Sequence, residues 1–384
     1  MMLGTALVTD HFLVREQFDD AEWEPFMRTR RFVDDEVLPV INDYWERAEF
    51  PWPLAHRLAE LELLDDGLSP LALGLVHMEL NRGDGSLGTF FGVQTGLAMK
   101  AIELLGSPEQ RSRWLAPMAR LEAIGAFALT EPDHGSDSVA LETSARRAGD
   151  EWVIDGAKRW IGNGSIADVA VVWARSSEDG QVKGFLVETD TPGYEATVIA
   201  GKGAARAVWQ ADIRLDSVRV PDASRLPGAH TFKDAGRVLV TTRGTVAWGA
   251  LGHAMAAYDI ALSYAKQRHQ FGRPLASFQI VQERLVRMLA EVTSMQLYCM
   301  QLARLADAGL VSDTIAGLAK FNNTRRARQV IAAARDLLGG NGILLENHVI
   351  RHMSDIEVLH TFEGTETMQA LIVGRDITGF GAFA

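Results

Sequence analysis

The residue best suited to acid–base chemistry in this sequence is Glu363, in the segment Phe362-Glu363-Gly364-Thr365 near the C-terminus. Gly364 has no side chain to crowd the backbone, so the carboxylate can act as a base while the adjacent N–H faces a reacting carbonyl group. A glutamate followed by glycine is also a common solvated loop end. The segment alone leaves both interpretations open, and the rest of the sequence must decide between them.

A second candidate segment, residues 127–137, has the composition of a strand that runs into a loop rich in glycine and hydroxyl side chains. Such a loop can offer backbone N–H groups and hydroxyls to a planar heterocycle. It can equally be a turn in which aspartate and serine side chains bind the backbone. Residue types alone favour the turn.

The spacing of apolar residues shows which elements must position these segments. Helical spacing dominates the first third, and short β-like runs separated by turn residues follow from about residue 126. Helical spacing then returns. In one long stretch the apolar residues are spaced alternately four and three positions apart, which indicates one buried helix face, or seam: Val281, Leu285, Met288, Val292, Met295, Cys299 and Leu302. We therefore predict an α+β multidomain fold: an N-terminal α-helical domain at 1–125, a central antiparallel β domain at 126–232 and a C-terminal four-helix bundle at 233–384.

Composition limits the classes of function. The 384 residues are 47% hydrophobic and carry a formal net charge of -12, which disfavours nucleic acid and anionic membranes as partners. No apolar run approaches the length of a membrane span, and no signal peptide is evident at the N-terminus. A single cysteine, Cys299, indicates a reducing compartment. We expect a soluble, cytoplasmic protein.

Five segments together resemble a known family. They are residues 127–137, 158–163 (Lys-Arg-Trp-Ile-Gly-Asn), 268–272 (Arg-His-Gln-Phe-Gly), 336–342 (Asp-Leu-Leu-Gly-Gly-Asn-Gly) and the segment around Glu363. In order and spacing they are similar to motifs of the acyl-CoA dehydrogenase family, closest to its glutaryl-CoA dehydrogenase branch, over essentially the whole chain. The resemblance implies the family's helical, β and four-helix-bundle domains, bound FAD, and oxidation of an acyl thioester at Cα–Cβ.

The resemblance also implies site residues. Ser136, Arg243 and Gly364 would border the substrate. Arg268 and Gln279 would bind the pyrophosphate and adenosine part of FAD, and residues 336–340 would reach the flavin of a neighbouring subunit. The full set of implied flavin contacts is Phe127, Leu129, Thr130, Ser136, Trp160, Ile161, Gly162, Arg268, Phe271, Gln279, Asp336, Leu337, Gly339, Gly340, Thr365 and Phe383.

By the same resemblance, Glu363 would take the Cα proton and flavin N5 the hydride. Burial among apolar groups would raise the pKa of Glu363, and its own backbone N–H would help to hold the thioester oxygen. Electrons would pass to an electron-transfer flavoprotein, and the enzyme would be a homo-oligomer, expected to be a tetramer.

Two departures from the family pattern bear on the substrate and the electron acceptor. The glutaryl enzymes have an arginine and a glutamate where Gly88 and Asn81 stand here, so a glutaryl substrate is not expected. Leu87, Phe90 and Phe91 can instead line an apolar acyl pocket or form helix core.

The second departure is Gly162, which replaces a threonine; the change would remove a donor near flavin N5 and open space there. This variant also resembles plant short-chain acyl-CoA oxidases. A short-chain oxidase that uses oxygen, and a dehydrogenase of carrier-protein-bound acyl groups, remain alternatives to the acyl-CoA dehydrogenase.

Other signals carry less weight. His348 and His352 follow Glu346 at a spacing that could bind a metal, but no third ligand is evident, and we predict no metal site. A non-enzymatic helical scaffold is the contrasting class, and it would bind no flavin.

Overall fold

The computed structural model describes residues 9–64 and 67–381, and its N-terminal part is helical. Ser107 and Gln110 form a capping box around Pro108 at the start of α7, as a serine followed by a first-turn proline predicts. An eight-residue π-helical segment, η4, joins α5 to α6. The elements are α1 Asp20–Phe32, η3 Val33–Val37, α2 Ile41–Arg47, α3 Trp52–Glu60, α4 Pro70–Gly83, α5 Gly85–Phe91, η4 Gly92–Met99, α6 Lys100–Leu105 and α7 Pro108–Ala119.

The central part is a seven-stranded sheet in the order β1-β4-β2-β3-β7-β6, with β5 paired to β4. Its pairings are mostly antiparallel, as expected, but β1–β4 and β2–β4 are parallel. The direction of these pairs follows from how the chain returns to the sheet, which apolar spacing does not encode. The strands are β1 Gly125–Ala128, β2 Ser144–Ala148, β3 Glu151–Gly162, β4 Val169–Ser176, β5 Val182–Glu188, β6 Tyr194–Val198 and β7 Gln210–Pro221.

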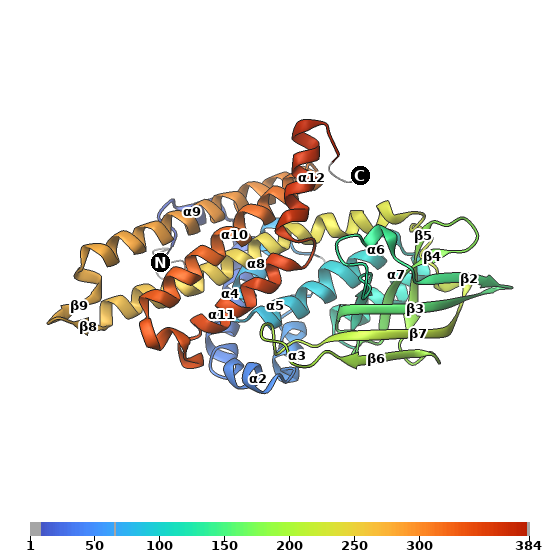
Figure 1. The fold of residues 1–384 in the computed structure, drawn as a ribbon, viewed down its shortest axis with the longest axis horizontal. Helices are drawn as coiled ribbons and strands as arrows, with labels where there is room; N and C mark the ends of the chain where they lie inside the picture. Colours follow the sequence, from blue (N-terminus) through green and yellow to red (C-terminus); the bar gives the residue numbers. More distant parts are fainter. Residues whose placement is uncertain (1–8, 65–66, 382–384) are drawn as a thin grey trace.

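Long helices form the C-terminal part, and the predicted seam of α9 is buried from Leu285 to Leu302. In Figure 1 the helix α8 runs along the molecule, with the β domain beside one end and a short hairpin, β8–β9, at the other. Among the described residues, no helix has the length and hydropathy needed to cross a bilayer. The elements are α8 Phe232–Gln267, β8 His269–Gln270, β9 Arg273–Pro274, α9 Gln279–Asp307, α10 Asp313–Leu337, α11 Val349–Thr361 and α12 Glu366–Thr378.

Two glycines allow α4 and α8 to pack closely. A Cβ atom on Gly252 of α8 would lie 2.0 Å from the carbonyl oxygen of Met78 in α4. One helical turn before Met78 in α4, a Cβ atom on Gly74 would lie 2.3 Å from the ring of Trp248 in α8. A larger residue at Gly252 would press on the backbone of α4, and one at Gly74 would have to displace the Trp248 ring, so the α4–α8 pair is closely packed.

Candidate active site

Glu363 lies in the short loop between α11 and α12 and has an unusual backbone conformation. Its φ is 57°, in the left-handed region, and the φ of Gly364 is 86°. A non-glycine residue rarely adopts this conformation, which is maintained only where the surroundings enforce it. The loop is therefore held in place by other parts of the structure.

Side chains from α10 and α12 hold the carbonyl groups of this loop. Lys320 Nζ donates to the carbonyl oxygens of Phe362, at 2.6 Å, and of Gly364. Gln369 Nε2 donates to the carbonyl oxygens of Glu363 and Gly364, each at 3.0 Å. Within the described residues, the N–H groups of Glu363 and Gly364 have no hydrogen-bond partner. The loop thus keeps its acceptors occupied and its donors available.

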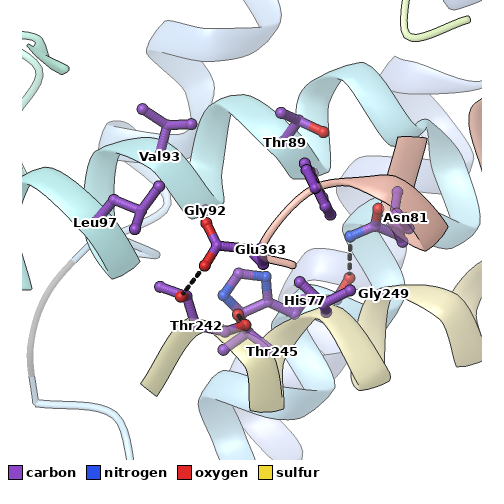
Figure 2. A pocket seen from close by; sticks show the side chains of 14 residues that line it. His77, Asn81, Thr89, Gly92, Val93, Leu97, Thr242, Thr245, Gly249 and Glu363 are labelled. Atoms are coloured by element: carbon purple, nitrogen blue, oxygen red, sulfur yellow. Dashed lines mark hydrogen bonds between the residues drawn. The ribbon is translucent and has the colours of Figure 1, made fainter. Parts of the chain in front are cut away.

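The Glu363 carboxylate points toward α8 and is held by Thr242, whose Oγ1 donates to Glu363 Oε2 at 2.7 Å (Figure 2). Burial raises the pKa of Glu363, and the Thr242 bond and the positive charges of Lys320 and Arg243 oppose that rise. Thr242 Oγ1 is also 3.1 Å from the carbonyl oxygen of Leu239. Thr242 can therefore donate to the carboxylate, or donate to Leu239 and accept from the protonated acid.

A cavity of about 60 Å³ surrounds this carboxylate; we call it the Glu363 cavity. None of its described lining residues is an arginine or a lysine. The lining comes from α4, α5, η4, α8, α11 and the Glu363 loop: His77, Asn81, Gly88, Thr89, Gly92, Val93, Leu97, Thr242, Thr245, Val246, Gly249, Leu359, Phe362 and Glu363.

Gly88 and Asn81, which stand where the glutaryl enzymes are expected to have an arginine and a glutamate, both line this cavity. Asn81 Nδ2 donates to the carbonyl oxygen of His77 at 2.8 Å. A Cβ atom on Gly88 would lie 2.3 Å from the same Asn81 Nδ2 atom. Asn81 therefore fills the space that a side chain at position 88 would need. Leu87, Phe90 and Phe91 are buried in the core and do not line the cavity, which favours the helix-core interpretation of all three.

The predicted flavin residues of β1 and β3 lie on strands that reach the Glu363 cavity, because Gly162 of β3 contacts Val93 of its lining. The backbone N–H of Arg159 donates to the carbonyl oxygen of Thr130 at 2.9 Å, which joins β3 to the loop after β1. Phe127, Leu129 and Ile161 are buried, whereas Trp160 is 53% exposed and has a φ of 64°.

Gly162 does not open space, contrary to the expectation from sequence. A Cβ atom there would lie 2.8 Å from Val93 Cγ2, so the valine of η4 fills the volume that a threonine would occupy. Val93 also lines the Glu363 cavity. The family pattern indicates that a hydroxyl is missing at position 162, but it does not indicate that Val93 fills the space.

We predict that Gly162→Thr lowers stability by about 1–3 kcal/mol through overpacking against Val93. Because the clash is with one side chain, the double variant Gly162→Thr, Val93→Ala should recover most of the loss. Thermal unfolding of the two variants and of Val93→Ala alone measures both effects. Equal destabilisation in the presence and absence of Val93 would contradict the prediction.

The other implied flavin residues lie at the opposite end of the helical part, around the β8–β9 hairpin, the start of α9 and the end of α10 (Figure 1). Phe271 at the hairpin tip is 93% exposed, and Asp336 pairs with Arg284 at 2.7 Å. This group is Arg268, Phe271, Gln279, Asp336, Leu337, Gly339 and Gly340. One copy of the chain therefore does not bring the two groups together.

The remaining predicted residues have separate positions. Thr365 caps α12 by accepting from the N–H of Met368, Ser136 is exposed in its loop, and Arg243 pairs with Asp313. Phe383 lies outside the described residues. His352, considered above for a metal, instead faces His253, with their Nδ1 atoms 2.8 Å apart.

Comparison with known proteins agrees with this architecture. Models of the acyl-CoA dehydrogenase N-terminal, middle and C-terminal domains match residues 26–122, 126–218 and 232–378. The chain is 34% identical to the bovine (Bos taurus) mitochondrial short-chain specific acyl-CoA dehydrogenase over 358 residues, which cover 90% of this chain and 87% of that protein.

Solved structures are similar over nearly the whole chain. A glutaryl-CoA dehydrogenase from Mycobacterium smegmatis superposes with a TM-score of 0.95 at 41% identity, covering 98% of this chain and 99% of that one. A second M. smegmatis glutaryl-CoA dehydrogenase structure, in complex with FADH2, has a TM-score of 0.95 at 37% identity and covers 97% and 98%. Together, the three matched domains and these relatives show that the chain belongs to the acyl-CoA dehydrogenase family of FAD-dependent oxidoreductases.

Proposed function

We propose that this enzyme catalyses α,β-dehydrogenation of an acyl-CoA thioester, with Glu363 as the base that removes the Cα proton. The observation that carries the proposal is the pairing of a buried carboxylate of raised pKa with free backbone N–H groups in the same loop. A raised pKa brings a carboxylate closer to the basicity that proton abstraction requires. The free donors are suited to the thioester oxygen, on which negative charge develops as the proton leaves.

The surrounding residues support each part of this role. Lys320 and Gln369 fix the loop carbonyls, so the N–H of Glu363 is oriented before the substrate arrives. Thr242 can hold Glu363 both before and after it takes the proton, because its hydroxyl has an alternative acceptor in Leu239.

FAD, when bound, supplies the acceptor for the hydride from Cβ. The residues of this chain fit such a group: Trp160 presents an exposed indole at the end of β3, where a planar ring can stack. Residues 127–130 and Thr365 would hold it from the same chain. The implied residues around the β8–β9 hairpin would contact the FAD of a neighbouring copy, since they lie at the other end of the molecule.

Because the implied flavin residues form two groups at opposite ends of one chain, we infer that the active enzyme is a homo-oligomer, with a tetramer as the specific prediction. Phe271, Ile280, Val286 and Ile343 are more than half exposed in a single chain, which supports burial of the hairpin end against another copy. An electron-transfer flavoprotein as the acceptor and a cytoplasmic location stay predictions.

The acyl group is proposed to lack a distal carboxylate. Asn81 and the closed-off position at Gly88 offer no positive charge, and a carboxylate buried without one is costly. Val93 fills the space beside Gly162, which removes the main argument for easier access of oxygen. We therefore favour a dehydrogenase over a short-chain oxidase.

Anaerobic titration of the purified flavoprotein with straight, branched and aromatic acyl-CoAs tests the function. We expect at least one saturated thioester to bleach the flavin absorbance; a protein without flavin, or flavin that no thioester reduces, would overturn the proposal. Parallel assays of hydrogen peroxide release and of artificial-acceptor reduction distinguish the oxidase. The same acyl groups on carrier protein distinguish the carrier-dependent enzyme.

A further inference from the structure

A second, larger cavity lies behind the Glu363 cavity. It has a volume of about 480 Å³ and is lined by α4, η4, α6, α8 and α9. Pockets that hold small organic ligands usually have volumes of roughly 300 to 1,000 Å³, so this cavity has the size of a ligand site whereas the Glu363 cavity does not. His77 and Thr245 line both cavities and so form the boundary between them.

His77 is the polar group with free hydrogen-bonding capacity at this boundary. It is 3% exposed, and its Nε2 has no hydrogen-bond partner among the described residues. Thr245 is already committed, because its hydroxyl donates to the carbonyl oxygen of Thr242 at 2.8 Å. Figure 2 shows the ring of His77 turned toward the space in which Glu363 lies. Buried polar atoms are nearly always paired, so an unpaired ring nitrogen on a residue that lines both cavities calls for a partner.

The state of the ring restricts what that partner can be. Burial lowers the pKa of His77 to about 3, so the imidazole is neutral at physiological pH. A neutral imidazole donates or accepts one hydrogen bond at Nε2 but does not compensate a full negative charge. The group that suits it is a hydroxyl or a carbonyl oxygen, not a carboxylate.

We propose that the acyl chain of the substrate passes His77 into the second cavity and carries a neutral oxygen group beyond Cβ that hydrogen-bonds to His77 Nε2. This inference rests on the proposed dehydrogenation and names its substrate class: acyl thioesters longer than the Glu363 cavity, bearing a hydroxyl or keto group. His77 is then a specificity-determining residue that takes no part in the proton or hydride transfer.

The test uses octanoyl-CoA and the four isomeric hydroxyoctanoyl-CoAs that carry the hydroxyl at carbon 5, 6, 7 or 8. For the wild-type enzyme we expect one isomer to exceed octanoyl-CoA in kcat/KM by about ten-fold, the factor that a net hydrogen bond supplies. His77→Leu should abolish this preference, so that no hydroxylated substrate exceeds octanoyl-CoA when both are measured with that variant. His77→Gln, which keeps a polar amide, should restore part of it.

A wild-type enzyme that bleaches with octanoyl-CoA but prefers none of the isomers would overturn the role of His77 without affecting the proposed function. Equal losses for all substrates in His77→Leu, with flavin content and thermal stability unchanged, would also overturn it. If no acyl-CoA bleaches the flavin, the proposed function fails, and this inference fails with it.

The passage into the second cavity has its own test. Ala306 of α9 lines that cavity, so Ala306→Phe should lower kcat/KM for dodecanoyl-CoA by about ten-fold or more while butanoyl-CoA is unaffected. Ala308→Phe, at the exposed end of the same helix, is the matched control. Equal sensitivity of the long and short chains would contradict the path.

Discussion

Glu363→Gln should bind FAD normally and lose turnover by about 10³- to 10⁴-fold, the upper range of what a general base contributes. Glutamine has nearly the same shape as glutamate and can still accept a hydrogen bond from Thr242, but it cannot take up the Cα proton. The backbone contacts of Lys320 and Gln369 involve carbonyl groups, so the substitution leaves them in place. Steady-state kinetics with an artificial acceptor and the visible absorbance of the flavin measure the two results.

Glu366→Gln provides the matched control for that experiment. Glu366 lies three residues away at the start of α12 and pairs with His360 at 3.1 Å. Its loss should change turnover by less than about three-fold, since a partly exposed contact with a histidine whose pKa is lowered by burial contributes little. Normal turnover in Glu363→Gln would show that another residue is the base.

Lys320→Met should lower kcat by about 100-fold, the scale of loss that a displacement near 1 Å produces. Methionine preserves the length of the side chain but removes the donor to Phe362 and Gly364, which frees the loop to leave its left-handed conformation. The variant should still bind flavin, because the hydrogen bonds that Lys320 Nζ makes to described residues all go to the Glu363 loop. Lys183→Met, which removes a partly buried lysine paired with Asp179 in the β domain, is the control.

The same variant should also change the pH profile. The charge of Lys320 lowers the pKa of Glu363, and the base is active only when deprotonated, so losing that charge moves the rising limb of kcat/KM to higher pH. Burial lowers the pKa of Lys320 to about 7, so in the wild type this support is complete below that pH and fades above it. If Lys320→Met lowers kcat but leaves the acid limb of kcat/KM at the same pH, the charge of Lys320 does not lower the pKa of Glu363.

Much of the fold was predictable because it depends on local periodicity. The helical, β and helical succession follows from apolar spacing, and the seam of α9 is buried along most of its predicted length. The parallel β1–β4 pairing was not predicted, since residues 125–128 and 169–172 meet only through the path of the chain between them. The domain boundaries stay predictions.

The site was predictable to the extent that the family motifs carry it. Those motifs drew attention to Glu363 and Gly364, but they contain none of Lys320, Thr242 or Gln369. Thr242 and Glu363 are 121 residues apart and meet only because α8 and the loop after α11 pack together. Lys320 is a buried residue of α10, and a lysine at an apolar position of a helix indicates a buried acceptor nearby. Nothing in the sequence indicated that Val93 fills the space beside Gly162.

The close contacts at Gly74 and Gly252 have a consequence for selectivity. They lie on the helices that carry His77, Asn81, Thr245 and Gly249, and they hold α4 and α8 at a fixed separation. Helices packed this closely would have to give up that packing before the gap between them could widen for a broader acyl group. The enzyme should therefore choose among substrates as a rigid sieve does, by excluding branches that exceed the gap, and not by reshaping itself around each one.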